Sequence, residues 1–221
     1  GENSLPAVKS HLDALRGRAS RLEYRREGHV FDLSVEPLRD ANGHVVGCAG
    51  MALDVTERVK SEEEVKFRAT HDGLTGLANY REFIERLEHE VRRSDRTRAS
   101  FGDLDDLKVI NDRYGHLAGN QALRSLALIM REYCRATDVA ARYGGDEFAM
   151  LLLDADRERA EGVAERIRAH LASRTEPLTL SASMGVSVYP ADGVSGAQLL
   201  EAADKRLYKS KRARVRTKTT D

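Results

Sequence analysis

Hydrophobic positions in the first fifty residues change from a helical to a strand-like spacing. Val8, Leu12 and Leu15 recur at helical intervals, and the run stops at Gly17, which predicts a short helix. Two stretches with alternating apolar side chains follow, as in half-buried strands. The turn sequence "DANGH" favours a hairpin to a third strand, "VVGCAGMALDV", whose apolar run predicts deeper burial. One helix and three strands form a thin core, which predicts little independent stability.

Residues 55–71 are strongly charged and contain neither Gly nor Pro, which predicts a connecting helix. Thr56 is the candidate N-cap, and Glu57 lies in the first turn, where an acid is favourable. The weak apolar stripe consists of Val55, Val59 and Val65. A solvated rod and a two-chain coiled coil are both compatible with this pattern.

Residues 72–221 alternate amphipathic helices with short strands. The stretch "GHLAG" is interpreted as a turn before a helix that begins at Asn120. The strands "DVAARY" and "EFAMLLL" are joined by two glycines, and "LTLSASMGVSVYP" fits one strand or a bent pair. The order of elements predicts a sheet with helices on one face.

Composition narrows the possible functions without choosing one. The 221 residues suffice for one large domain or two small ones, and 41% hydrophobic against 33% charged residues indicates a soluble chain with a core. The formal net charge of +0 gives no general attraction to nucleic acid or anionic membranes. No apolar run approaches the ~20 residues of a membrane span. Cys48 and Cys134 are interpreted as buried thiols of a reducing cytosol, so a cytoplasmic location is expected.

The stretch "ARYGGDEFAML" places two acids, Asp146 and Glu147, directly after two glycines. Further upstream, Asp103 and Asp105 alternate at the end of a predicted strand and therefore point to opposite faces. If the two strands are neighbours, Asp103 and one hairpin acid meet at one sheet edge. Carboxylates beside a lysine suit Mg²⁺ and a nucleoside triphosphate. A solvated hairpin tip explains the same residues, and both interpretations stay open.

Three motifs in sequence order resemble the GGDEF family of diguanylate cyclases. They are "DGLTGLANYREF", "DLDDLKVINDRYGH" and "RYGGDEF", within residues 70–213. The resemblance implies an α+β fold (an α/β sandwich) like the palm of nucleotide cyclases and polymerases. It also implies that two GTP molecules condense into cyclic di-GMP with release of two pyrophosphates. Each monomer brings one GTP, so a homodimer is the active form, with two Mg²⁺ or Mn²⁺ ions per active site.

The resemblance assigns the metal ligands by matching position. Asp103 and Asp146 would bind metal through their side chains, and Leu104 through its carbonyl oxygen. Glu147 would be a further ligand or would assist deprotonation of the attacking 3′-hydroxyl.

The same comparison assigns phosphate contacts. The backbone N–H groups of Asp106 and Leu107 would cradle phosphates at a helix start. Lys108, counted among the catalytic residues, and Lys211 would neutralise phosphate charge. Val215 falls where the family usually has an arginine, and Arg214 or Arg216 is a possible substitute.

Base recognition is where this sequence departs from the family. Asn111 would read guanine, and His116 is a substrate-binding candidate that could equally be a structural hydrogen-bonding residue. The family commonly has Asp where this chain has Asn120, and an Asn side chain complements adenine better than guanine. Weakened guanine selectivity, with a mixed cyclic GMP-AMP product, is one interpretation. Helix capping by Asn120, with Asn111 still reading guanine, is the other.

The stretch "RATD" resembles the RxxD inhibitory site of the family. Arg135 would grip guanine or phosphate, Asp138 would accept from guanine N–H groups, and Arg166 would add a secondary contact. Product inhibition by cyclic di-GMP is therefore expected. The structural alternative is an arginine at a helix C-terminus and an aspartate that starts a turn.

The first region resembles the C-terminal half of a PAS domain through "VEPLRDANGHVVGCAGMALDVTER". The expected domains are a partial PAS domain over 1–54, a connecting signalling helix over 55–71 and a GGDEF catalytic domain over 72–221. A catalytically silent domain that binds cyclic di-GMP is the competing function. Nucleic-acid binding through the basic C-terminal stretch is disfavoured, because aromatic residues are not interleaved with the charges.

Overall fold

The computed structural model describes residues 5–93, 98–173 and 180–218, and within these ranges it leaves out the side chains of residues 5, 98–103 and 213–218. The chain divides into two compact units, residues 1–67 and 68–221. Each helix in the described ranges is too short or too polar to serve as a membrane span.

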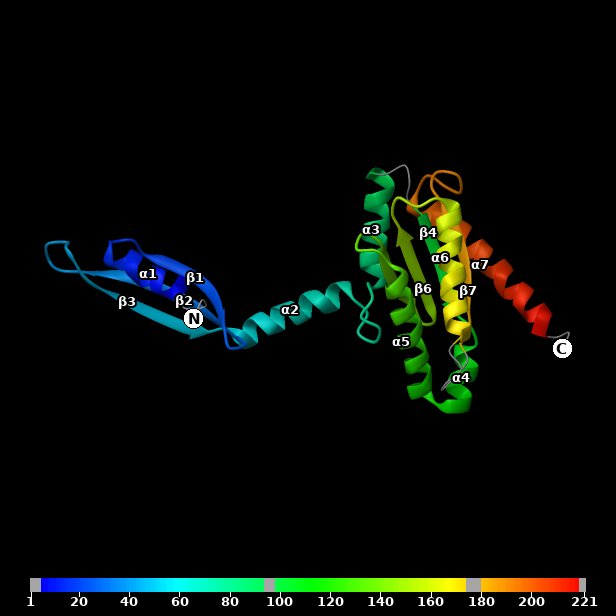
Figure 1. Cartoon of the computed structure of the whole chain (residues 1–221), viewed down its shortest axis with the longest axis horizontal. Coiled ribbons are helices and arrows are strands. Elements are labelled where there is room, and N and C mark those ends of the chain that lie inside the picture. The colour runs from blue at the N-terminus through cyan, green and yellow to red at the C-terminus, as the bar shows by residue number, and fades with distance from the viewer. Residues whose placement is uncertain (1–4, 94–97, 174–179, 219–221) are drawn as a thin grey trace. The chain divides into compact units, whose positions relative to one another are not determined.

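The first unit consists of helix α1 (Leu5–Leu15) on one face of an antiparallel sheet in the order β1-β2-β3 (Figure 1). The strands are β1 (Ser20–Arg26), β2 (His29–Arg39) and β3 (Val45–Asp54). Ala14, Leu33 and Val35 form the small core. The prediction that the third strand is the more buried one is wrong, because its residues from Ala49 to Asp54 are all exposed. In the described sheet β3 is an edge strand, and α1 covers only one of its faces.

Helix α2 (Thr56–Thr70) follows β3 directly. Thr56 is the first helical residue rather than the predicted N-cap, and its hydroxyl accepts a hydrogen bond from the Val30 N–H at 2.8 Å. Asp54 is the acceptor at this end, since its Oδ1 lies 2.9 Å from the Thr56 nitrogen. Hydrogen bonds from the Thr56 hydroxyl and then the Thr56 amide lower the pKa of Asp54 to about 2.

The second unit is built on a four-stranded antiparallel sheet in the order β5-β6-β4-β7 (Figure 1). Its elements in chain order are α3 (Tyr80–Arg93), β4 (Arg98–Leu104), α4 (Leu107–Tyr114), α5 (His116–Tyr133), β5 (Val139–Gly144), β6 (Glu147–Leu152), α6 (Arg157–Ser173), β7 (Ala182–Val188) and α7 (Gly196–Lys218). Strand β7 is one strand, so the bent-pair alternative is wrong.

Helices cover both faces of this sheet, so the expectation of helices on one face is wrong. Helices α4, α5 and α6 pack on one face, and α3 and α7 on the other. The reason lies in β6, where every residue after Glu147 is buried. Helix α7 approaches β7 closely at Gly185, where a Cβ atom would lie 2.1 Å from the Ala203 carbonyl oxygen.

Helix α5 begins at His116, four residues before the predicted start, so "GHLAG" forms its first turn. Gly119 lies inside the helix, where α5 packs closely against α4. A Cβ atom at this position would come within 2.0 Å of Asn111 Oδ1, so the close packing requires a glycine. Asn120 therefore lies in the second helical turn, and the alternative that it caps the helix is wrong.

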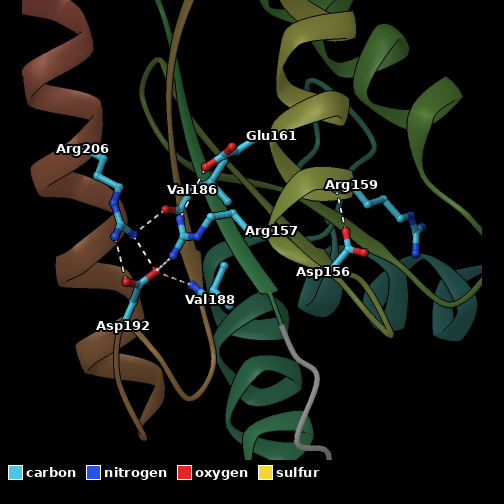
Figure 2. Close-up of polar contacts among 8 residues, drawn as sticks. All are labelled: Asp156, Arg157, Arg159, Glu161, Val186, Val188, Asp192 and Arg206. Atoms are coloured by element: carbon cyan, nitrogen blue, oxygen red, sulfur yellow. Dashed lines mark hydrogen bonds and ion pairs between the residues drawn. The ribbon is translucent and has the colours of Figure 1, made fainter.

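The connection between β7 and α7 is held by a cluster that we call the Asp192 clamp, comprising Asp192, Arg157 and Arg206 (Figure 2). Arg157 Nη2 lies 2.6 Å from Asp192 Oδ2, and Arg206 contacts both carboxylate oxygens at 2.7 Å. Arg206 also donates to the Val186 carbonyl at 2.6 Å. The clamp joins α6, the β7–α7 loop and α7.

Candidate active site

The two acids of "GGDEF" lie where β5 turns into β6. The turn is formed by Gly145 and Asp146, and Gly145 has a φ of +30°, a value that favours glycine. Gly144 pairs with Glu147 after an irregularity in the register that follows Arg142. Asp146 is half-buried and Glu147 is exposed, and both residues lie at the turn end of the hairpin.

Strand β4 pairs with β6 of this hairpin, so the condition for Asp103 to meet a hairpin acid is fulfilled. The register places Asp103 directly opposite Glu147, and the Leu104 N–H donates to the Asp146 carbonyl at 2.9 Å. The side chain of Asp103 lies outside the described part of the structure. The backbone nevertheless brings three acids from two strands to one end of the sheet.

Asp105 is buried and does not belong to this acidic edge. Its carboxylate is 7% exposed and accepts a hydrogen bond from the Ser183 hydroxyl at 2.8 Å. Its backbone N–H donates to the Ser181 carbonyl at 2.9 Å. Asp105 thus anchors the loop between β4 and α4 to the chain around β7.

Three of the residues predicted to contact phosphate lie at the start of α4, and the fourth, Lys211, lies on α7. Asp106 precedes the helix with a φ of 60°, and Leu107 is its first residue. The first amides of a helix have no acceptor within the helix and can point to an anion. Lys108, in the first turn, is exposed. Lys211 is half-buried on α7, a helix that packs against β4 and β7.

The predicted base-reading residues come together where α4 meets α5. The amide group of Asn111 lies against Gly119, next to Asn120 in the chain. Both asparagines are half-buried, whereas His116 is exposed at the start of α5. The structure therefore brings the Asn111 side chain against the turn of α5 that precedes Asn120. Arg214, Val215 and Arg216 have side chains outside the described part of the chain.

The two residues of the RxxD stretch have different surroundings. The Asp138 side chain is 0% exposed and accepts from the backbone N–H groups of Arg135 and Leu153, each at 3.0 Å. Arg159 Nη2 lies 3.3 Å from the same carboxylate. Arg135 is exposed. In this arrangement Asp138 holds the turn together, and Arg135 is the residue available to a ligand.

A pocket of about 530 Å³ lies beside this stretch. Its walls include Thr70, His71, Arg131, Cys134, Arg135 and Asp138. Burial and then the Asp138 carboxylate raise the pKa of the Cys134 thiol to about 12.

Asp138 precedes β5 and Asp146 follows it, so the RxxD stretch and the acidic edge lie about 20 Å apart, at opposite ends of the strand. Arg166, on α6, lies over the Tyr133 ring at 5.7 Å.

Sequence reasoning gave no role to Arg142 and Asp72, which the structure joins. Arg142 Nη1 lies 3.2 Å from Asp72 Oδ2, and Arg142 also donates to the Gly145 carbonyl within the hairpin turn. The only signal in the sequence was that each residue stands inside one of the quoted motifs.

Comparisons with known proteins find the same family of domains by sequence and by structure. Residues 69–217 match the family model described as "Diguanylate cyclase, GGDEF domain". Diguanylate cyclase DgcP of Pseudomonas aeruginosa is 38% identical over 221 residues, covering 96% of this chain and 32% of the relative. Probable diguanylate cyclase DgcE of Escherichia coli is 34% identical over 197 residues, covering 84% of this chain and 18% of the relative.

Among solved structures, the second unit resembles the coiled coil and GGDEF domain of DgcB from Caulobacter crescentus in complex with c-di-GMP. It has a TM-score of 0.64 and 31% identity, and the match covers 71% of this chain and 88% of the other. The chain spans only 18% to 32% of the length of the two curated relatives.

Proposed function

Because the chain belongs to the GGDEF family of diguanylate cyclases, we propose that it condenses two GTP molecules into cyclic di-GMP and releases two pyrophosphates. The observation that carries the proposal is the register of β4 against the hairpin. It sets Asp103 opposite Glu147 and bonds Leu104 to Asp146, so the acids that the family motif requires converge at one edge.

The acidic edge fits a divalent cation. Its donors are carboxylate oxygens and the Leu104 carbonyl, and hard Mg²⁺ or Mn²⁺ prefers oxygen ligands. Asp103 and Asp146 are the proposed side-chain ligands, with two ions per active site. A metal ion bound there would lower the pKa of the attacking 3′-hydroxyl and would neutralise negative charge on the departing pyrophosphate. Glu147, exposed beside it, would be a further ligand or accept the hydroxyl proton.

The neighbouring elements would hold the substrate. The amides of Asp106 and Leu107 at the start of α4 would bind phosphate oxygens, with Lys108 and Lys211 balancing their charge. Asn111, which packs against Gly119, would read the base, and Asn120 and His116 stay candidate contacts. Each chain offers one such half-site, and closing two phosphodiester bonds requires two GTP molecules face to face. A homodimer is therefore the proposed active form.

Product inhibition is the proposed control, through the RxxD stretch. Arg135 is exposed at the rim of the 530 Å³ pocket, where its guanidinium could grip a guanine edge or a phosphate. Asp138 acts in this proposal by holding the turn in which Arg135 sits. Arg166 would add a secondary contact after leaving the Tyr133 ring.

Asn120 supports a second candidate, a cyclase of relaxed base selectivity. It follows Gly119, the residue against which Asn111 packs, which supports a position near the base, and the capping alternative does not apply. An Asn amide opposite guanine leaves one donor facing another, whereas adenine offers a matching acceptor and donor. We expect a guanine preference about tenfold to a hundredfold below that of an Asp-bearing site.

The first unit, with one helix on an antiparallel sheet, is proposed to be the C-terminal part of a PAS domain that leads through α2 into the catalytic domain.

Product analysis tests this function. The protein is incubated with Mg²⁺ and GTP, ATP or both, and the products are identified by mass spectrometry. Cyclic di-GMP from GTP, lost in Asp146→Ala, is the expected result, and cyclic GMP-AMP from the mixture would support relaxed selectivity. Binding of cyclic di-GMP without any product would instead identify a silent domain. Formation of cyclic di-GMP alone would rule out the relaxed-selectivity candidate.

A further inference from the structure

We propose that Arg142 is a positioning residue, which fixes the peptide that carries Asp146 and ties it to the loop at the end of α2. This loop, residues 71–79, is called the entry loop below. The inference rests on the proposed function in one respect, because it concerns the placement of Asp146 as a metal ligand. All the contacts used in this argument, between residues 69 and 146, lie within the second unit.

The Arg142 guanidinium grips the hairpin turn from within. Its Nε and Nη2 lie 3.0 Å and 2.7 Å from the Gly145 carbonyl oxygen, and its side chain is only 17% exposed. The Gly145 carbonyl and the Asp146 N–H belong to one peptide plane, so holding the first orients the second. On its other side, Asp146 is fixed by its carbonyl, which accepts from Leu104. Asp146 is thus held at both of its peptide bonds.

The third nitrogen of Arg142 reaches the entry loop. Nη1 lies 3.3 Å and 3.2 Å from the two oxygens of Asp72, which is 23% exposed. Asp72 in turn accepts from the Thr75 amide at 2.8 Å and the Thr75 hydroxyl at 2.7 Å. Burial raises the pKa of Asp72, but the bonds from Thr75 and Arg142 outweigh it and lower the pKa overall. Asp72 is therefore ionised at neutral pH and holds the guanidinium.

The entry loop is bonded to α2 on one side and to β5 on the other. The Asn79 side-chain amide donates to the Ala69 carbonyl, and the Asn79 backbone amide to the Thr70 carbonyl, both at 2.9 Å. The Ala78 N–H donates to the Ala140 carbonyl at 3.1 Å, and the Arg142 N–H to the Ala78 carbonyl at 2.9 Å. A continuous set of hydrogen bonds thus runs from the last turn of α2 to the turn that carries Asp146.

The structure offers a matched control for this residue. Arg206 also bridges a carboxylate and a backbone carbonyl, those of Asp192 and Val186, but it does so at the β7–α7 connection (Figure 2). Replacing either arginine by lysine keeps the charge and removes the fork that binds two acceptors at once. Both variants lose a similar local contact, and only Arg142→Lys disturbs the hairpin.

Two measurements test the inference. The first is amide hydrogen exchange, followed by mass spectrometry of peptides that cover the entry loop and the hairpin. We expect exchange in both to be about tenfold faster in Arg142→Lys and unchanged in Arg206→Lys. The second is Mn²⁺ binding, measured by electron paramagnetic resonance with a GTP analogue that carries a methylene bridge between its α and β phosphorus atoms. Arg142→Lys should weaken Mn²⁺ about tenfold, and Arg206→Lys should not.

Asp72→Asn tests the ion pair separately. It should change the hairpin less than Arg142→Lys does, and the double variant should be no worse than Arg142→Lys alone, because both act through one contact. Equal hairpin exchange in Arg142→Lys and the wild type would overturn the inference. So would additive effects in the double variant. A wild-type protein that releases no pyrophosphate would count against the proposed function, while the exchange comparison would still decide the role of Arg142.

Discussion

At the residue scale, Arg135 and Asp138 have different proposed roles in the RxxD stretch: Arg135 would contact the ligand, and Asp138 anchors the turn. Asp138 is fully buried and satisfies two backbone amides and Arg159, a residue that is 21% exposed. Arg135 contributes backbone groups to this turn, since its amide donates to the Asp138 carboxylate and its carbonyl accepts from the Asp138 N–H, while the residue itself is exposed.

Two substitutions separate these roles. Arg135→Ala should relieve inhibition by cyclic di-GMP and leave the melting temperature unchanged. Asp138→Asn should also relieve it, and should lower the melting temperature by about 5 °C, because an amide pairs poorly with Arg159 and with a backbone donor. Inhibition curves and calorimetry check both effects. The same melting temperature for the two variants would contradict the assignment of Asp138 as the anchor.

Asn120 leads to a second prediction at this scale. Asn120→Asp should raise the preference for GTP over ATP about tenfold to a hundredfold, because both carboxylate oxygens accept from guanine N–H groups. The preference is the ratio of kcat/KM for the two nucleotides. Asp112→Asn, exposed on α4, is the control and should leave this ratio unchanged. An unchanged ratio in Asn120→Asp would show that this residue does not contact the base.

Residue roles could be predicted where a motif carried them and not where they depend on tertiary contact. A meeting of Asp103 with a hairpin acid was expected on the condition that their strands are neighbours, and the register of β4 against β6 meets that condition. The pairing of Arg142 with Asp72 was not expected, since seventy residues separate them and each side chain has many possible partners. The burial of the Asp138 side chain could not be predicted either, because it depends on packing against Arg159 of α6.

At the element scale, the Asp192 clamp governs how α7 meets the sheet. Hydrogen bonds from Arg206, against the opposing effect of burial, lower the pKa of Asp192 well below its usual range, and Arg157 and the Val188 amide lower it further. A carboxyl group whose pKa is lower in the folded state stabilises the fold above its unfolded pKa of about 3.9 and loses this effect as the pH falls through the folded value.

Asp192→Asn should therefore destabilise the protein most at neutral pH. We expect a loss of about 2–4 kcal/mol at pH 7, because two partly buried arginines lose their counter-charge, and a smaller difference from the wild type below about pH 3. Urea unfolding at several pH values measures this. Glu161→Gln removes an exposed carboxylate whose ion pair with Arg157, at 3.5 Å, lies at the rim of the clamp, and it should cost less than 1 kcal/mol. A loss for Asp192→Asn that does not change with pH would contradict the role of its charge.

Most elements could be predicted from periodicity, and the errors have physical causes. Helix α5 was expected to begin at Asn120 because Gly115 and Gly119 suggested a turn, but Gly119 is inside the helix to make room for Asn111. The expectation of helices on one face overlooked the continuous apolar run of β6, whose burial on both faces requires helices on both sides of the sheet. The apolar run of β3 looked similar, yet it belongs to an edge strand covered on one face.

At the scale of the whole molecule, the chain combines a catalytic family domain with a smaller unit ahead of it. The predicted divisions at 54 and 71 stay a prediction, and the structure divides into units 1–67 and 68–221, with α2 reaching across that boundary. A sequence pattern finds the connecting helix because it lacks Gly and Pro. It does not determine where contacts with each unit stop, since that depends on side-chain packing such as that of Thr56 and Asn79.

The central claim is that two copies of this chain, each with one acidic edge, build cyclic di-GMP from two GTP molecules. Pyrophosphate release from GTP and Mg²⁺, followed over a wide range of protein concentration, tests it most directly. The account predicts specific activity that rises with protein concentration and levels off, and a loss of at least about a hundredfold in Asp146→Ala. No release even at high protein concentration, or release that survives in Asp146→Ala, would contradict it.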